Sequence, residues 1–304
     1  MDTLPYYLIQ GLCYGAIIAL IALGYSLVYG IIKLINFAHG EFYMVGAYAG
    51  FGVYALLPAG LSPWLAIPAV LAVSGTAGAA IAGGAEYVAY RPIRKSGRLA
   101  ALLTAIGVSF LLQSVFSLVK DAQPLQYPAG PGSVGALCQH PVPVGADGIM
   151  AVNFAYVPAA LVLGLGLWWI VMRTRFGRAM RALSQDPDAA ALMGVNVNAV
   201  VRRTFLLGGF LAGVAGSLIA FQNIISPTMG FLPGLKAFIA AVIGGIGSVP
   251  GALIGGFAVG LLDYLVVWAG VPTGYRDLAA FVVLILVLVI RPQGLLGRRE
   301  SEKV

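Results

Sequence analysis

Long apolar runs separated by short polar connections make up most of the chain. A helix needs about 20 apolar residues to cross the hydrocarbon core of a bilayer. Eight runs reach or approach that length, at residues 5–32, 36–57, 64–90, 99–119, 154–172, 199–222, 250–270 and 275–291. A further run, 234–247, is short and ends in glycines. The pattern predicts an all-α, polytopic integral membrane helical bundle that forms a single transmembrane domain over residues 1–304.

Basic residues in the connections predict the orientation of the bundle. Residues 91–98 hold four Lys or Arg residues, residues 173–203 hold six, and the tail after residue 292 holds three. Segment 120–153, in contrast, holds only Lys120. Connections on the cytoplasmic side of a membrane are enriched in Lys and Arg. We therefore expect residues 91–98, the loop at 173–198 and the tail at 292–304 to be cytoplasmic, and the loop at 120–153 to be periplasmic.

The number of crossings follows from this orientation. The loop at 173–198 and the tail are expected on the same side, so an even number of crossings must separate them. Runs 199–222, 250–270 and 275–291 provide three. The short run 234–247 must then provide the fourth, as a broken helix buried in protein. We expect about nine crossings, with the N-terminus outside and the C-terminus in the cytoplasm.

Charged residues are scarce and unevenly placed. The chain is 60% hydrophobic and 10% charged, with a net charge of +7, whereas a soluble domain carries roughly 25% charged residues. The basic residues form short clusters between apolar runs, a pattern that excludes nucleic-acid binding. The ionisable residues within or beside apolar runs are few: Lys33, His39, Glu41, Lys236 and Asp263. A proton or sodium symporter usually buries more of them, in pairs, so another subunit would have to supply the energy for transport.

The sequence lacks the common motifs of enzymes and cofactor sites. There is no G-x-x-x-x-G-K-[ST] loop, so we expect no ATP bound by this chain. Its two histidines, His39 and His140, are far apart, and no metal-ligand spacing is present. Cys13 and Cys138 are expected to be free thiols. We predict no cofactor, no metal site and no enzymatic activity.

Polar residues interrupt the second apolar run at its start: Asn36, His39, Gly40 and Glu41. One interpretation is a helix break that lines a path or contacts a neighbouring helix. The other is an ordinary helix start at the cytoplasmic end of the crossing, with Asn36 as N-cap and Glu41 near the positive helix terminus. The spacing alone does not decide between them.

A second unusual stretch is rich in glycine and includes Gly244, Gly245 and Gly247, with Pro250 shortly after. Glycine permits close approach of backbones, and proline suits the first turn of a new helix. The stretch is typical of a tight turn between two packed helices, and direct contact with a substrate is the alternative.

The cytoplasmic loop contains a short helix with strong end signals. Asp186 suits the N-cap position, Pro187 the first helical residue, and Gly194 the C-terminal stop. The predicted helix, 187–193, is too short to be stable alone in water. It must pack on the chain's own membrane domain or on a cytoplasmic partner. The candidate docking residues are Asp186, Pro187, Asp188, Ala190, Leu192, Met193 and Gly194.

Several sequence blocks, in order along nearly the whole chain, carry a family resemblance. They are Gly-Tyr-Ser-Leu-Val-Tyr-Gly at 24–30, Ile-Asn-Phe-Ala-His-Gly-Glu at 35–41, Tyr-Arg-Pro-Ile-Arg at 90–94, the loop segment 186–194, the stretch 236–256, and Pro-Gln-Gly-Leu-Leu-Gly at 292–297. With these blocks the chain resembles the permease subunits of branched-chain amino-acid ABC importers.

The resemblance implies a subunit of a larger machine in the bacterial inner membrane. With a second related permease it would form the path for branched-chain amino acids. Two ATP-binding-cassette subunits would bind ATP, and a periplasmic amino-acid-binding protein would deliver the substrate. Segment 186–194 corresponds to the loop that couples the permease to the ATPase, and transport would proceed by alternating access. The alternatives are a permease for urea, short amides or other amino acids, or a stand-alone facilitator.

Overall fold

The computed structural model describes residues 4–33, 36–58, 61–94, 96–119, 123–130, 132–144, 147–291 and 294–296. Seven helical segments are long and apolar enough to cross a membrane: Leu4–Ile32 (α1), Pro63–Ile93, Leu99–Val119, Asn153–Arg173 (α7), Val197–Ala220 (α10), Val249–Trp268 (α12) and Thr273–Ile290. The segment Pro63–Ile93 consists of α3 (Pro63–Ala85), a π-helical turn (Glu86–Tyr90) and α4 (Arg91–Ile93). Leu99–Val119 belongs to α5 (Arg98–Val119), and Thr273–Ile290 includes α13 (Arg276–Ile290). Two further helices are α2 (His39–Leu56) and the shorter apolar helix α11 (Phe231–Gly244). The polytopic helical bundle is therefore confirmed, and each predicted run contains a helix. The number of crossings and the orientation stay predictions.

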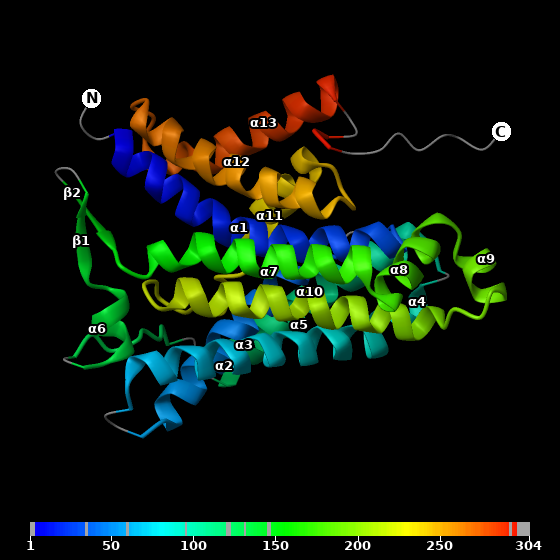
Figure 1. The fold of residues 1–304 in the computed structure, drawn as a ribbon, viewed down its shortest axis with the longest axis horizontal. Coiled ribbons are helices and arrows are strands. Elements are labelled where there is room, and N and C mark those ends of the chain that lie inside the picture. The colour runs from blue at the N-terminus through cyan, green and yellow to red at the C-terminus, as the bar shows by residue number, and fades with distance from the viewer. Residues whose placement is uncertain are drawn as a thin grey trace.

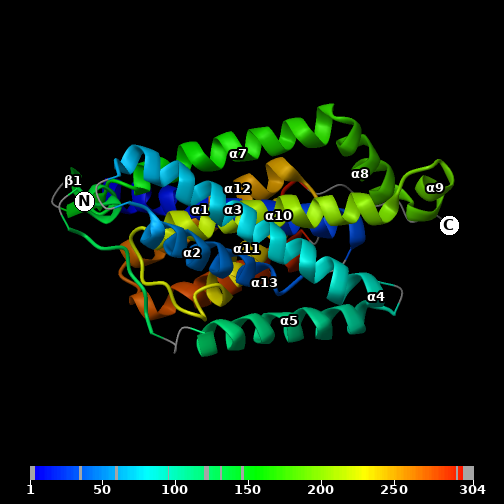
Figure 2. The ribbon, with the colours of Figure 1, turned by 90° about the horizontal axis from the view of Figure 1, so that it is seen from below.

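Helices α1 and α10 form the centre of the bundle, and the other helices pack around them (Figure 1). Helix α1 packs along α12, and α10 packs between α2 and α3. The outer helices α5 and α7 lie on opposite sides of the molecule (Figure 2). Their outward faces expose large apolar side chains, such as Phe110 of α5 and Trp169 of α7, as expected for helices that contact lipid.

Small residues allow the central helices to approach each other closely. Along α1 and α12, a Cβ added to Gly260 would overlap the backbone of Gly15. Between α2 and α10, a Cβ on Gly46 would overlap the backbone of Gly213. Such contacts suit a membrane, where helices gain little from apolar burial and instead associate through close packing and hydrogen bonds.

The loop at 120–153 contains structure that the sequence did not predict. It includes the short helix α6 (Val134–Cys138) and an antiparallel pair of strands, β1 (Pro141–Val144) and β2 (Asp147–Met150). Backbone hydrogen bonds in both directions join Leu125 to Ile225, beyond the end of α10. Tyr127 is buried, with its ring centroid 5.0 Å from those of Tyr54 and Phe221. The loop thus packs as a cap on this end of the bundle.

Helices α2 and α11 both begin inside the bundle rather than at its end. The N-terminus of α2 lies beside Gly24 of α1, because a Cβ at Gly24 would meet the His39 imidazole. Gly24 precedes the end of α1 at Ile32 by eight residues, which corresponds to about 12 Å of helix. The start of α11 lies against the start of α2, since Gly230 and Gly234 both contact Gly40. The expected short helix is present as α11, which is continuous over Phe231–Gly244, and its role as a crossing stays a prediction.

The predicted orientation can be tested with single cysteines at exposed positions. Ser96 lies between α4 and α5, and Gly130 lies in the 120–153 loop with open space around it. In a background with Cys13 and Cys138 replaced by alanine, we expect Gly130→Cys to react with a membrane-impermeant maleimide in intact cells. Ser96→Cys should react only after the membrane is opened. Labelling of both positions from outside would contradict the orientation.

The native thiols provide an internal check on this experiment. Cys13 and Cys138 are both buried and free. Burial raises the pKa of the Cys138 thiol to about 11, so only a very small fraction is thiolate near neutral pH. The unmodified protein should therefore label slowly from outside at pH 7, and faster as the pH rises toward 11.

Candidate functional site

The starts of α2 and α11 meet at a contact built from glycine. Cβ atoms added to Gly40, Gly230 or Gly234 would each fall on the backbone of the opposing segment. No other residue type permits this approach without a shift of one helix. We refer to residues 36–41 and 230–234 together as the helix junction. A helix N-terminus carries partial positive charge. The N-termini of α2 and α11 therefore place two partial positive charges in the same region.

Asn36 stabilises the turn that leads into the junction. Its side-chain oxygen accepts hydrogen bonds from the Ala38 amide at 3.1 Å and from the Tyr90 hydroxyl at 2.5 Å. The N-cap of α2 is Ala38, which makes no side-chain cap. The interpretation of Asn36 as the N-cap is therefore wrong. Its amide oxygen instead links the turn to the end of the π-helical segment, Glu86–Tyr90.

Glu41 is buried at the junction and only half of its carboxylate is satisfied. Oε1 accepts hydrogen bonds from Ser109 Oγ at 2.9 Å and from Gln113 Nε2 at 2.8 Å. Oε2 has no hydrogen-bond partner among the described residues. It faces the start of α11, since a Cβ at Gly230 would lie 3.2 Å from it. An ionisable group inside a membrane protein is costly and is usually functional.

The depth of Glu41 differs from the expectation. It belongs to the first turn of α2, as predicted. However, its partners Ser109 and Gln113 lie about halfway along α5, which spans Arg98–Val119. Glu41 is therefore inside the bundle, and its placement at the cytoplasmic end of the crossing is wrong. The turn back into the bundle before α2 explains the difference, and no local sequence signal indicates its depth.

His39 packs at the junction as an aromatic ring. Its ring centroid lies 4.7 Å from that of Tyr25 and 5.6 Å from that of Phe42. Neither ring nitrogen has a hydrogen-bond partner in the described part of the chain. Within the same residues, no group of three or more His, Cys, Asp and Glu side chains could hold a metal ion.

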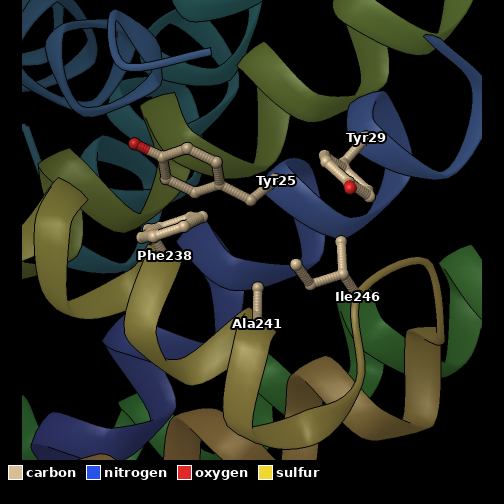
Figure 3. Close-up of a pocket in the computed structure, with 5 residues that line it drawn as sticks. All are labelled: Tyr25, Tyr29, Phe238, Ala241 and Ile246. Carbon is tan, nitrogen blue, oxygen red and sulfur yellow. The ribbon is translucent and has the colours of Figure 1, made fainter. Parts of the chain in front are cut away.

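A small apolar hollow lies next to the junction (Figure 3). Its lining residues come from α1, α11 and the turn after α11: Tyr25, Tyr29, Phe238, Ala241 and Ile246. The Tyr25 ring forms part of the lining, while its hydroxyl points away from the hollow. That hydroxyl faces the junction, where a Cβ at Gly234 would lie 3.7 Å from it. The ring of Tyr25 thus lines the apolar hollow, while its hydroxyl faces the helix junction, where Glu41 lies.

The other buried charges form paired groups. Lys236 of α11 contacts Asp263 of α12 at 2.5 Å and Asp277 of α13 at 2.7 Å. Arg276 lies 3.7 Å from Asp263. Elsewhere, buried Glu86 pairs with Arg94 at 2.5 Å. Sequence reasoning identified Lys236 and Asp263 as buried charges but not as partners, and it missed Glu86. Partners on different helices leave no local signal.

The glycines after α11 form a tight turn. Gly245 and Gly247 have φ angles of 102° and 88°, which favour glycine. A Cβ on Gly244 would overlap the backbone of Gly251 at the start of α12. The amides of Leu295 and Leu296 donate to the carbonyls of Ile243 and Gly244, so a segment near the C-terminus covers the end of α11. These contacts agree with the turn interpretation of the glycines.

The short helix in the loop at 173–198 forms with the predicted cap and stop residues. Helix α9 spans Pro187–Leu192, one residue shorter than predicted, and follows α8 (Arg175–Gln185). The Asp186 side chain accepts hydrogen bonds from the amides of Asp188 and Ala189, both at 3.0 Å. At the other end, Gly194 has a φ of 85°. Its amide donates to Ala191, and that of Val195 donates to Ala190, which is the Schellman arrangement.

Helix α9 projects from one end of the bundle, beyond α8 (Figures 1 and 2). Leu192 is 89% exposed and Met193 is 84% exposed. Ala190, in contrast, is buried against the chain itself, so its assignment to an exposed docking surface is wrong. Two adjacent large apolar side chains are thus exposed on the part of the chain that projects from the bundle (Figure 1).

Comparisons with known proteins agree along almost the whole chain. Residues 7–288 match the family described as branched-chain amino acid transport system / permease component. The chain is 42% identical to the high-affinity branched-chain amino acid transport system permease protein LivH of Escherichia coli K12, covering 97% of this chain and 96% of that protein. It is 43% identical to the corresponding protein BraD of Pseudomonas aeruginosa, covering 98% and 97%. A probable branched-chain amino acid transport permease protein of Methanocaldococcus jannaschii is 29% identical, covering 93% and 90%. No solved structure matches.

Proposed function

Because the chain belongs to the family of branched-chain amino acid transport permeases, we propose that it is the permease subunit of an ATP-driven importer of branched-chain amino acids. The observation that carries this proposal is the full-length similarity to permeases whose names state that substrate. The exposed apolar end of α9 supports a machine of several subunits, since it offers a contact surface that the chain leaves uncovered.

The complete transporter contains four kinds of subunit in this proposal. This chain and a second related permease form the path in the bacterial inner membrane. Two ATP-binding-cassette subunits bind and hydrolyse ATP on the cytoplasmic side. A periplasmic binding protein delivers the amino acid at the opposite side. The folded loop at 120–153 lies at the end of the bundle away from α9 (Figure 1) and is placed to meet that binding protein.

Helix α9 transmits the movement of the cassettes to the membrane domain. The aspartate cap and the terminal glycine make it a rigid element. Its buried Ala190 fixes it to the chain, and Leu192 and Met193 present an apolar face outward. A cassette subunit that covers this face as it closes around ATP would move α8 and α10, which flank α9. Alternating access of the path then follows.

The helix junction and the adjacent hollow form part of the path. The free Oε2 of Glu41 accepts hydrogen bonds, and a branched-chain amino acid carries an ammonium group that donates them. The hollow beside Tyr25 and Phe238 is apolar but small, so it would have to widen to take the aliphatic side chain. Gly40 keeps the two helix starts in contact. The glycine turn at Gly244, Gly245 and Gly247 positions the other end of α11.

Glu41→Gln tests the role of the free carboxylate oxygen. The amide oxygen can still accept hydrogen bonds from Ser109 and Gln113, but an NH2 group replaces Oε2. A hydrogen bond to a charged group contributes roughly 1.5–3 kcal/mol, so we expect ATP-driven leucine uptake to fall about 10- to 100-fold. ATP hydrolysis stimulated by the loaded binding protein should persist, because docking and assembly are unchanged.

Ser109→Ala is the matched control, since it removes a donor only from Oε1. We expect its uptake to stay within a few-fold of the unmodified protein. If Glu41→Gln transports normally, Oε2 makes no contact with the substrate. If it loses stimulated hydrolysis together with uptake, the carboxylate has a structural role and the proposed contact is wrong.

Leu192→Asp tests the role of α9. It places a charge in the proposed contact with the cassette, and a buried charge without a partner costs several kcal/mol. The variant should reach the membrane in normal amounts, since Leu192 is exposed. It should no longer co-purify with the cassettes and should not take up leucine. Gln185→Asp adds the same charge at an exposed position of α8 and should behave normally. Normal assembly and uptake by Leu192→Asp would exclude α9 as the coupling element.

A further inference from the structure

Two arginines from different elements share one exposed aromatic ring near the end of α3. The guanidinium carbon of Arg91 lies 5.6 Å from the centroid of the Tyr87 ring, and that of Arg202 lies 6.0 Å from it. Arg91 begins α4 and Arg202 belongs to α10. Both arginines are exposed, and Tyr87 is 57% exposed. We refer to these three side chains as the arginine cluster.

The positive charge of the cluster is not neutralised within the described residues. Glu86 is the nearest acid in the sequence, but it is buried and pairs with Arg94. Arg94 also donates to Asn198 of α10, which ties the two elements together at this point. Neither Arg91 nor Arg202 has an ion pair within the part of the chain that the structure describes. Two guanidinium groups on one ring repel each other, so an anion that contacts both is favoured.

The π-helical turn Glu86–Tyr90 explains why the cluster faces outward. Glu86 and Tyr90 are buried and make contacts inside the bundle, to Arg94 and Asn36. Tyr87 and Arg91 lie on the opposite, exposed face. Turns of this type are uncommon and often occur at functional sites. The π-helical turn thus places Glu86 and Tyr90 inside the bundle, and Tyr87 and Arg91 on its surface.

The position of the cluster matches the boundary between hydrocarbon and water. Tyr87 and Arg91 lie in the last turns of the apolar segment Pro63–Ile93, at the end where α4 leads toward α5 (Figure 2). Val88, which follows Tyr87 in the chain, is 74% exposed, so an apolar side chain that suits lipid tails lies next to the cluster. Tyrosine is enriched at this level of a membrane. Guanidinium groups bind phosphate with paired hydrogen bonds.

We propose that the arginine cluster binds the phosphate group of an anionic phospholipid in the leaflet that surrounds this end of the bundle. The lipid tails lie against Val88, and the headgroup phosphate lies beside the Tyr87 ring, where it contacts Arg91 and Arg202. A bound lipid at this place would hold α4 against α10, next to the α10 end that follows α9. This site is separate from the helix junction.

The test uses the assembled transporter, stripped of native lipid and titrated with phosphatidylglycerol, with native mass spectrometry to count bound lipids. Each basic residue near an anionic lipid strengthens its binding, and losing two should raise the Kd about 30-fold. We expect this rise for the double variant Arg91→Gln, Arg202→Gln, measured for one phosphatidylglycerol per permease. Tyr87→Leu, which keeps both charges but not the ring, should weaken binding several-fold.

The matched control is Arg173→Gln with Arg203→Gln, two exposed arginines outside the cluster, and it should bind lipid normally. Excess glycerol phosphate, which carries the headgroup chemistry without tails, should not displace the lipid. The proposal is overturned if the cluster variant binds phosphatidylglycerol normally, if the control loses as much, or if glycerol phosphate competes. It is also overturned if the cluster variant keeps the lipid but loses the cassette subunits, since the arginines then contact protein.

Discussion

The close contact of helix backbones through small residues is the constraint on which the rest of the structure depends. Apolar burial contributes little to helix association in a bilayer, so packing and hydrogen bonds must hold the bundle. Glycine pairs such as Gly46 with Gly213 and Gly15 with Gly260 bring the central helices into backbone contact. At that separation short polar side chains reach across, as Ser74 does to Ser217 at 2.9 Å. The same kind of contact at Gly40 brings two helix starts together inside the bundle.

The buried charges fall into two groups with different consequences. Lys236 and Arg276 neutralise Asp263 and Asp277, and Arg94 neutralises Glu86. Removing one member of such a group would leave an unpaired buried charge, which destabilises the fold. Glu41 differs, because its hydrogen bonds come from the neutral side chains of Ser109 and Gln113, although Glu86 and Asp263 also keep one oxygen without a partner in the described residues. We therefore propose Glu41, which lies between two helix starts and has no ion pair among the described residues, as the polar group that meets the substrate.

Sequence patterns predicted the features that depend on local interactions. Apolar runs located the helices, and the cap and stop residues of α9 formed the hydrogen bonds expected of Asp186 and Gly194. The errors concern features set by tertiary contacts. Asn36 resembles an N-cap, but its side chain bonds to Tyr90, 54 residues away. The depth of Glu41, the burial of Ala190, and the β1–β2 pair in a proline-rich loop likewise depend on neighbours that the local sequence does not identify.

The central claim is that this chain carries branched-chain amino acids only when cassettes hydrolyse ATP. The most direct test is uptake into proteoliposomes that contain the two permeases and both cassettes, with the binding protein outside and ATP either enclosed or left out. Labelled leucine and labelled urea are compared in parallel. The account predicts that leucine accumulates against its gradient only with ATP, and that urea does not accumulate. Equilibration of leucine without cassettes or ATP, or accumulation of urea in place of leucine, would contradict it.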